Sequence, residues 1–293
     1  MHSRAFGTTG LTVSALGLGT GSIGASDMDE SAASRLLNEA LDLCVTLIDT
    51  ARGYGLAEER IGRHIAHRRS EYVLSTKVGY GIDGVPDWTY ECVAAGVDRA
   101  LRVMRTDVLD VVHLHSCPLD TLLRTDVIDA LDAAKAAGKI RVVAYSGEND
   151  ALAWAVSSGR FTSFETSVNP FDQASLAQSI PRASNYGYGV IAKRAVGNAP
   201  WRFSECPQGE YCEVYWHRMH ALAYERTGLA WDEFALRFSA FTPGVSSAII
   251  GTSSLENLRR NVAIVERGAL PDSVTQGVQA RYRDIGQSWL GEI

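Results

Sequence analysis

The stretch KIRVVAYSGENDALAWAVSSGRFTSFETSVN, residues 139–169, decides which fold class this chain belongs to. It begins with an apolar run (139–147) and ends with a second β-like run (161–169). The segment between them is typical of a helix and stops at Gly159, a residue that accepts the left-handed conformation at a helix C-terminus. The stretch therefore predicts two parallel strands joined by a helix.

The same alternation extends to both ends of the chain. Eight strand candidates are each followed by a helical pattern: ALGLG (15–19), VTLID (45–49), EYVLSTKVG (71–79), DVLDVVHLHS (107–116), the two runs above, YGVIAKR (188–194) and SSAIIG (246–251). Several are nearly continuous apolar runs, as expected of parallel strands that are covered on both faces. Eight such units predict one (β/α)8 TIM barrel that spans residues 1–293 as a single domain.

Two further local patterns bear on the fold. Thr9-Gly10 lies between two short β-like runs, which predicts an N-terminal β-hairpin ahead of the barrel. The glycine-rich GLGTGSIG (17–24) loosely matches the fingerprint of a doubly wound sheet, the competing fold. That fingerprint needs an acidic residue at the end of the second strand, and Asp49 lies too far along the chain.

Charge and cysteine content limit the partners. The net charge of −6 and the pI near 5.7 argue against nucleic acid or an anionic membrane as the main partner and favour a small molecule. The five cysteines form no CxxC pair, which indicates neither a disulfide framework nor a zinc ribbon. No signal peptide or apolar spanning run is visible, so we expect a reduced protein of the cytoplasm. The oligomeric state stays open.

Polar residues stand where the predicted strands end, which is where barrels of this type carry their chemistry. Asp49 ends the second strand, Lys77 the third and His115 the fourth, and Tyr54 follows in the loop after the second. This set suits hydride transfer to a carbonyl group. A phenol with a pKa of ~10 is a poor acid, a nearby ammonium lowers that value, and a carboxylate holds the ammonium charged. A neutral imidazole can donate to the developing oxyanion.

Six motifs carry a family resemblance: DTARGYGLAEERIG, STKVG, DVLDVVHLHS, KIRVVAYSG, GVIAKR and IIGTSSLENLRRN. In this order and spacing the chain resembles the aldo-keto reductase superfamily over essentially its whole length. The resemblance implies a catalytic tetrad of Asp49, Tyr54, Lys77 and His115, with Tyr54 as proton donor. It also implies an NAD(P)H-dependent reduction of an aldehyde or ketone, or the reverse oxidation of an alcohol or sugar.

The resemblance further implies a nicotinamide cofactor across the barrel mouth, NADP rather than NAD. Ser146 matches a carboxamide contact, and Gly147 replaces a common Asn. Lys193 and Arg194 stand where an aromatic residue usually stacks, so either Arg194 stacks instead or the pyrophosphate is held differently. Thr252, Ser253 and Ser254 open the last helix, whose N-terminus favours a phosphate. The implied cofactor residues are Gly19, Thr20, Ser146, Asn169, Lys193, Arg194, Gly251, Thr252, Ser253, Asn257, Arg260 and Asn261.

Other interpretations of the strand-end and loop residues remain open. Trp88 and Trp201, in loops at the mouth, are predicted pocket walls. The pair His113 and His115 is of a kind used by barrel metallohydrolases, but the eighth strand ends in Gly251 and not in Asp, and no other strand ends in His, so no metal site is predicted. A cofactor-binding regulatory subunit of the same fold is the alternative function. Loss of a tetrad member would favour it, and all four are present.

Overall fold

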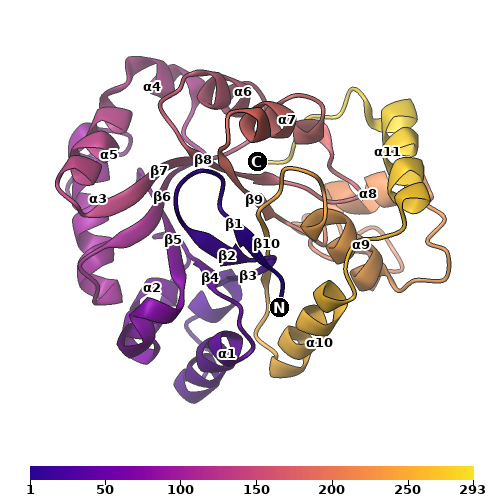
Figure 1. Cartoon of the computed structure of the whole chain (residues 1–293), viewed down its shortest axis with the longest axis horizontal. Coiled ribbons are helices and arrows are strands. Elements are labelled where there is room, and N and C mark those ends of the chain that lie inside the picture. The colour runs from indigo at the N-terminus through magenta and orange to yellow at the C-terminus, as the bar shows by residue number, and fades with distance from the viewer.

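A closed barrel of eight parallel strands forms the centre of the molecule, as the computed structural model of residues 1–293 shows (Figure 1). Each strand pairs with the next along the chain, and the last pairs with the first. The strands are β3 (Leu16–Gly19), β4 (Leu47–Asp49), β5 (Val73–Val78), β6 (Leu109–His115), β7 (Ile140–Ser146), β8 (Ser163–Ser167), β9 (Gly189–Lys193) and β10 (Ser247–Gly251). The predicted (β/α)8 barrel is confirmed.

Helices surround the barrel on its outside (Figure 1). The helices are α1 (Glu30–Asp42), α2 (Ala57–His64), α3 (Tyr90–Met104), α4 (Leu119–Arg124), α5 (Asp126–Ala136), α6 (Asn149–Ser157), α7 (Ser179–Asn185), α8 (Glu213–Leu222), α9 (Trp231–Ala240), α10 (Leu255–Glu266) and α11 (Asp272–Gly286). Short 3-10 turns are η1 (Gly21–Gly24), η2 (Ala66–Glu71), η3 (Ala174–Leu176) and η4 (Pro200–Arg202). No helix combines the length and the apolar composition needed to cross a membrane.

Local sequence signals account for the helix ends. The side chain of Asp29 accepts a hydrogen bond from the Ala32 amide and so caps α1. Gly138, Gly159 and Gly187 follow α5, α6 and α7 with φ between +69° and +73°. Glycine adopts this left-handed conformation without a Cβ penalty.

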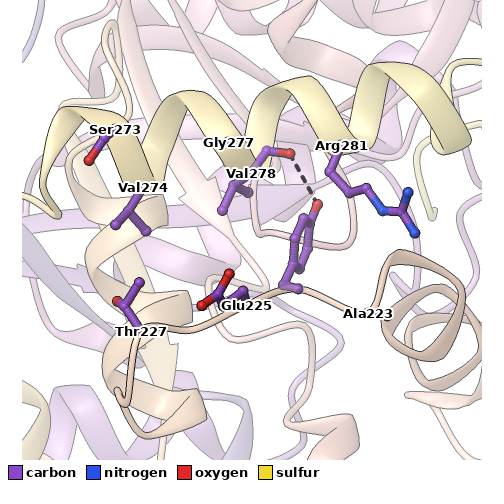
Figure 2. Close-up of a pocket in the computed structure, with 9 residues that line it drawn as sticks. Ala223, Glu225, Thr227, Ser273, Val274, Gly277, Val278 and Arg281 are labelled. Atoms are coloured by element: carbon purple, nitrogen blue, oxygen red, sulfur yellow. Dashed lines mark hydrogen bonds between the residues drawn. The ribbon is translucent and has the colours of Figure 1, made fainter.

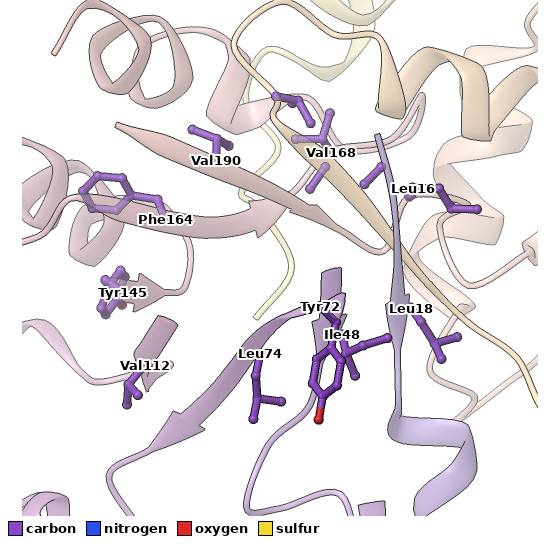
Figure 3. Close-up of a cluster of buried hydrophobic side chains, with 14 of the residues drawn as sticks. Leu16, Leu18, Ile48, Tyr72, Leu74, Val112, Tyr145, Phe164, Val168 and Val190 are labelled. Carbon is purple, nitrogen blue, oxygen red and sulfur yellow. The ribbon is translucent and has the colours of Figure 1, made fainter. Parts of the chain in front are cut away.

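The main hydrophobic core lies between the barrel and its helices (Figure 3). Outward-facing strand residues such as Leu74, Val112 and Phe164 pack there at 1% exposure or less. A smaller cluster fills the N-terminal end of the barrel and includes Phe6 and Leu47. The predicted hairpin, β1 (Ser3–Ala5) with β2 (Thr12–Ser14), covers that end. The other end of the barrel interior is polar, and it contains the candidate site.

Candidate active site

Lys77 occupies the centre of the barrel interior, near the C-terminal end of β5. Asp49 and Ser75 are register partners on β4 and β5, and both side chains point inward. As a result, Nζ of Lys77 lies 2.6 Å from Oδ2 of Asp49 and donates to the Thr50 carbonyl at 3.0 Å. The Ser75 hydroxyl donates to the other carboxylate oxygen at 2.8 Å. Asp49 is therefore a fully buried, fully oriented partner of the ammonium.

Tyr54 reaches the same centre from the loop after β4. Gly55 has φ +53°, and a Cβ there would lie 2.3 Å from the Gly24 carbonyl oxygen. A Cβ on Gly24 would lie 1.8 Å from the Tyr54 carbonyl oxygen, so these two backbones touch. The phenol ring lies with its centroid 5.2 Å from Nζ of Lys77 and 5.9 Å from the His115 ring. The four tetrad residues are thus brought together.

Glu165 on β8 joins this group, although the sequence analysis did not single it out. Its Oε2 lies 3.3 Å from Nζ of Lys77 and 3.9 Å from Nε2 of His113. The predicted site residues stand at strand ends, whereas Glu165 stands in the middle of β8. The sequence does indicate that Glu165 points into the barrel, because the polar residues Ser163, Glu165 and Ser167 alternate along β8.

Two carboxylates therefore face one ammonium in the barrel centre. Burial alone would lower the pKa of Lys77, but Asp49 and Glu165 raise it well above its ordinary value. Burial and repulsion from Glu165 raise the pKa of Asp49 to about 7. Burial also opposes the ionisation of Glu165, yet Lys77 and His113 lower its pKa to about 2. Because Asp49 and Glu165 interact strongly, their two carboxyl groups lose their protons in two steps. The pKa of about 7 describes the second step of this pair and not Asp49 alone.

The pKa of Tyr54 departs from the sequence-based expectation. Lys77 lowers it, as expected, but burial and the charges of Asp49 and Glu165 outweigh that effect and raise the pKa to about 12. The expected net lowering was therefore wrong, because it left out burial, which raises the pKa most, and the charges of the two carboxylates. The phenol is held in its protonated form across the neutral range.

An aromatic cluster covers one side of the tetrad. The hydroxyl of Tyr80 lies 2.6 Å from Nδ1 of His115, and the two rings stack with centroids 5.5 Å apart. Trp88 meets Tyr80 edge to face at 5.9 Å. Trp88, a predicted pocket wall, is therefore connected to the tetrad through Tyr80, which the sequence analysis missed.

Trp201, the other predicted wall, packs elsewhere. Its ring stacks on Trp231 of α9 at 5.8 Å and contacts Phe171. A cavity of about 340 Å³ on this side of the molecule lies between the loop after α8 and α11 (Figure 2). It is lined by Tyr224 and Arg281 among others and contains no tetrad residue.

Ser146 offers the clearest fit to a bound cofactor. Its hydroxyl is buried at the end of β7 and has no hydrogen-bond partner in the protein. The neighbouring Gly147 is explained by packing, because a Cβ there would lie 2.3 Å from the Tyr145 hydroxyl. That hydroxyl donates to the Cys117 carbonyl at 3.0 Å. The Asn that the resemblance implies after Ser146 does not fit beside Tyr145.

The remaining cofactor candidates at β8 and β9 have partners within the protein. The amide of Asn169 donates to the Arg194 carbonyl and accepts from the Phe171 amide. Lys193 pairs with the buried Glu148 at 3.3 Å. The Arg194 guanidinium donates to the Ser167 hydroxyl, the Glu292 carbonyl and the Tyr211 hydroxyl.

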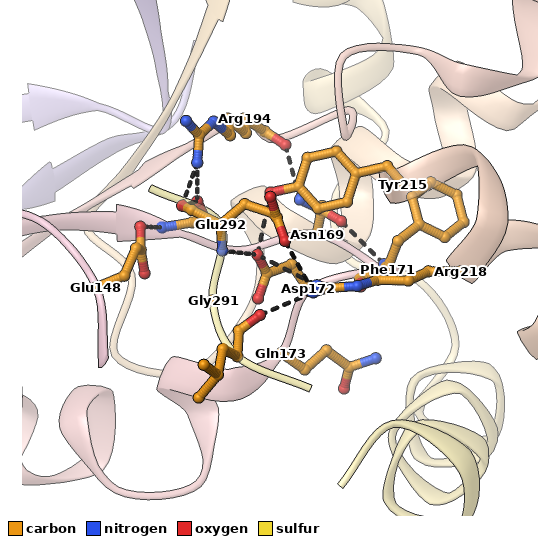
Figure 4. A network of polar contacts seen from close by, with 12 residues as sticks. Glu148, Asn169, Phe171, Asp172, Gln173, Arg194, Tyr215, Arg218, Gly291 and Glu292 are labelled. Carbon is orange, nitrogen blue, oxygen red and sulfur yellow. Dashed lines mark hydrogen bonds and ion pairs between the residues drawn. The ribbon is translucent and has the colours of Figure 1, made fainter. Parts of the chain in front are cut away.

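A polar network connects this side of the mouth to residues near the C-terminus (Figure 4). Arg218 of α8 donates to the Leu290 carbonyl at 2.8 Å and pairs with the Glu292 carboxylate at 3.0 Å. The Glu292 amide donates to Asp172 at 3.0 Å. Residues 290–292 thereby pack at the ends of β8 and β9, beside Arg194.

The residues predicted to contact a phosphate lie on the opposite side of the mouth. Gly19 and Gly251 are register partners on β3 and β10, and Thr20 is buried beside them. Ser254 caps α10 by accepting from the Asn257 amide. Of the other residues predicted there, Thr252 and Asn261 are buried, whereas Ser253, Asn257 and Arg260 are exposed. Arg260 pairs with Asp232 at 2.7 Å.

Two groups have the residue types of a metal site. Asp49, His113 and Glu165 have ligand atoms within 4.8 Å of one another, but the Lys77 ammonium already contacts both carboxylates there. The second group, Cys206, Glu213 and His217, lies on the loop before α8 and on that helix.

Comparison with known proteins identifies the family. The model of the aldo/keto reductase family matches residues 15–282. The chain belongs to the aldo/keto reductase family. This aldo/keto reductase is similar to AKR11C1 from Bacillus halodurans, an aldo-keto reductase solved in a holo form, with a TM-score of 0.84 and 27% identity over 96% of each chain.

Two curated relatives extend the comparison. The aldo/keto reductase chain is 26% identical to YqkF, an uncharacterized oxidoreductase of Bacillus subtilis, over 97% of each protein. It is 26% identical to L-galactose dehydrogenase of Arabidopsis thaliana over 89% of this chain and 87% of that protein. The family and these relatives support oxidoreductase chemistry at carbonyl groups, and the family generally binds NAD(P)H.

Proposed function

We propose that this chain interconverts a carbonyl compound and its alcohol with a nicotinamide cofactor, and that Tyr54 is the general acid and base. One observation carries the proposal. The phenol of Tyr54 lies over a buried ammonium, Lys77, which Asp49 holds at 2.6 Å. No structural role accounts for a charged pair of this kind beneath a tyrosine at a barrel mouth, since burying charges is costly.

The residues divide the reaction between them. In reduction, the Tyr54 hydroxyl gives its proton to the oxygen of the carbonyl, and the Lys77 ammonium stabilises the phenolate that is left. Burial first and then Lys77 lower the pKa of His115 to about 3, so the imidazole is neutral and can donate one hydrogen bond to the same oxygen. The cofactor, when bound, supplies the hydride.

For the cofactor, we propose Ser146 at the nicotinamide end and the N-terminus of α10 at the phosphates. The unpartnered Ser146 hydroxyl supports the first contact, and the free amides of a helix N-terminus support the second. NADP is proposed over NAD, with Arg260 near its 2′-phosphate. The exposed ion pair of Arg260 with Asp232 is of a weak kind that a phosphate can replace.

Substitution of Tyr54 by Phe tests the proposal. We expect kcat to fall by roughly 10²–10⁴ while the Kd for NADPH changes by less than about twofold, since the hydroxyl acts in proton transfer and not in binding. Tyr186→Phe, at an exposed tyrosine, is the matched control. A Tyr54→Phe enzyme with near wild-type kcat would falsify the role of Tyr54.

The substrate is proposed only as a class, an aldehyde, a ketone or a sugar. The similarity to L-galactose dehydrogenase makes aldoses and their lactols the first compounds to assay. A panel of these should be measured in both directions by nicotinamide absorbance. Tight cofactor binding by the wild-type protein with no turnover of any compound would favour the regulatory-subunit alternative instead.

A further inference from the structure

The buried cluster at the barrel centre has an excess of negative charge. It consists of Asp49, Lys77 and Glu165, with His113 beside them, and every member is at most 1% exposed. Burial lowers the pKa of His113 to about 4, so this imidazole is neutral near pH 7. Once both carboxylates are ionised, the cluster holds two negative charges and one positive charge.

Neighbouring charges do not remove this excess. The network beside the cluster contains three carboxylates and three cations, so it is neutral as a whole: Glu148, Asp172, Glu292, Lys193, Arg194 and Arg218. Arg52, which precedes Tyr54 in its loop and forms no ion pair, is partly exposed to water that screens it. The single negative charge at the centre therefore stays uncompensated.

A nicotinamide ring responds to such a charge in a definite way. The oxidised ring carries a positive charge and the reduced ring carries none. A fixed negative charge nearby therefore stabilises the oxidised form relative to the reduced form. We propose that Glu165 shifts the cofactor preference of this site toward the oxidised form, and hence favours hydride transfer from the bound reduced cofactor to a carbonyl compound. This inference rests on the proposed function of the site.

The reaction itself requires the ring to be close to the cluster. In reduction the Tyr54 hydroxyl would give its proton to the carbonyl oxygen, and the adjacent carbon would accept the hydride that the cofactor supplies. The nicotinamide ring would therefore have to reach the carbon next to the oxygen atom that Tyr54 protonates. Tyr54 in turn lies 5.2 Å from Nζ of Lys77, which is 3.3 Å from Glu165.

The size of the effect follows from Coulomb's law. A unit charge at roughly 10 Å, with an effective dielectric constant of about 20, changes a binding equilibrium on the order of tenfold. Glu165 is the member of the cluster to change, because Asp49 holds Lys77 through the shorter contact and also accepts from Ser75. Glu165→Gln removes one charge and keeps the size of the side chain.

The experiment measures Kd for NADP⁺ and NADPH by titration calorimetry at about pH 8.5, above the second ionisation of the carboxylate pair. In Glu165→Gln we expect the ratio of Kd for NADP⁺ to Kd for NADPH to rise on the order of tenfold over wild type. Glu59→Gln is the control, because that carboxylate pairs with Arg99 on α3 and lies outside the cluster. Its ratio should equal that of the wild type.

Each outcome decides between the two proposals. An unchanged ratio in a folded Glu165→Gln protein overturns the charge effect and leaves the proposed function standing. Failure of the wild-type protein to bind either form, tested also with NAD⁺ and NADH, overturns both. If Glu165→Gln does not fold, the ratio of Kd for NADP⁺ to Kd for NADPH in the wild-type protein tests the inference. We expect NADP⁺ to bind at least as tightly as NADPH, and a preference for NADPH of more than about tenfold overturns the inference.

Discussion

The hydroxyl of Tyr80 and Nδ1 of His115 lie 2.6 Å apart, with their rings stacked at 26°. Because the imidazole is neutral, only one of its nitrogens carries a proton. When the Tyr80 hydroxyl donates to Nδ1, that proton is on Nε2, which leaves Nε2 as the donor toward substrate. In that arrangement Tyr80 fixes both the tautomer and the orientation of His115.

We expect Tyr80→Phe to lower kcat/KM by roughly three- to tenfold, the effect of one lost hydrogen bond. The loss should appear mainly in KM, since His115 orients the carbonyl group and Tyr54 transfers the proton. Steady-state kinetics with any accepted substrate gives both constants. Equal kinetics for Tyr80→Phe and wild type would show that stacking alone orients His115.

Lys77→Met should destabilise the protein by about 3–5 kcal/mol, because Asp49 and Glu165 would then repel each other in the barrel centre without a cation. Urea unfolding measures the change. Adding Glu165→Gln to Lys77→Met should restore part of the stability. Lys139→Met breaks an exposed pair with Asp98 and should change stability by less than about 1 kcal/mol. A double variant no more stable than Lys77→Met would argue against the repulsion.

Acid should destabilise the fold through His113. Its folded pKa of about 4 lies below the ordinary 6.5, since burial opposes the charged form. The stability that this neutral histidine contributes is present above pH 6.5 and is lost as pH falls through 4, on the order of 3 kcal/mol. In His113→Asn, urea midpoints should therefore fall less steeply between those pH values. Parallel pH profiles for the two proteins would contradict this.

Gly24→Ala should reduce kcat more than tenfold and lower Tm, because its Cβ would collide with the Tyr54 backbone and displace the catalytic loop. Gly21→Ala is the matched control in the same 3-10 turn, since a Cβ there meets no atom within 4 Å. Thermal melts and steady-state kinetics of both variants measure the changes in Tm and kcat. A fully active Gly24→Ala enzyme would mean that the loop tolerates displacement.

Much of the barrel could be predicted from sequence because its signals are local. Apolar runs, helical patterns and the glycines at 138, 159 and 187 each act on a few neighbouring residues, and together they allow one closed topology. The same holds for Asp49, Lys77 and His115, since residues at the ends of parallel strands must meet at one end of a barrel.

Sequence patterns alone therefore establish the barrel and the residues at its strand ends. The tertiary structure decided the electrostatics. Glu165 and Lys77 are far apart in the chain, and only closure of the barrel brings them to 3.3 Å. In that buried space each charge acts over several ångströms, so burial, Asp49 and Glu165 together reverse the expected shift of the Tyr54 pKa. A local sequence pattern does not show the combined effect of charged residues that lie far apart in the chain on one pKa.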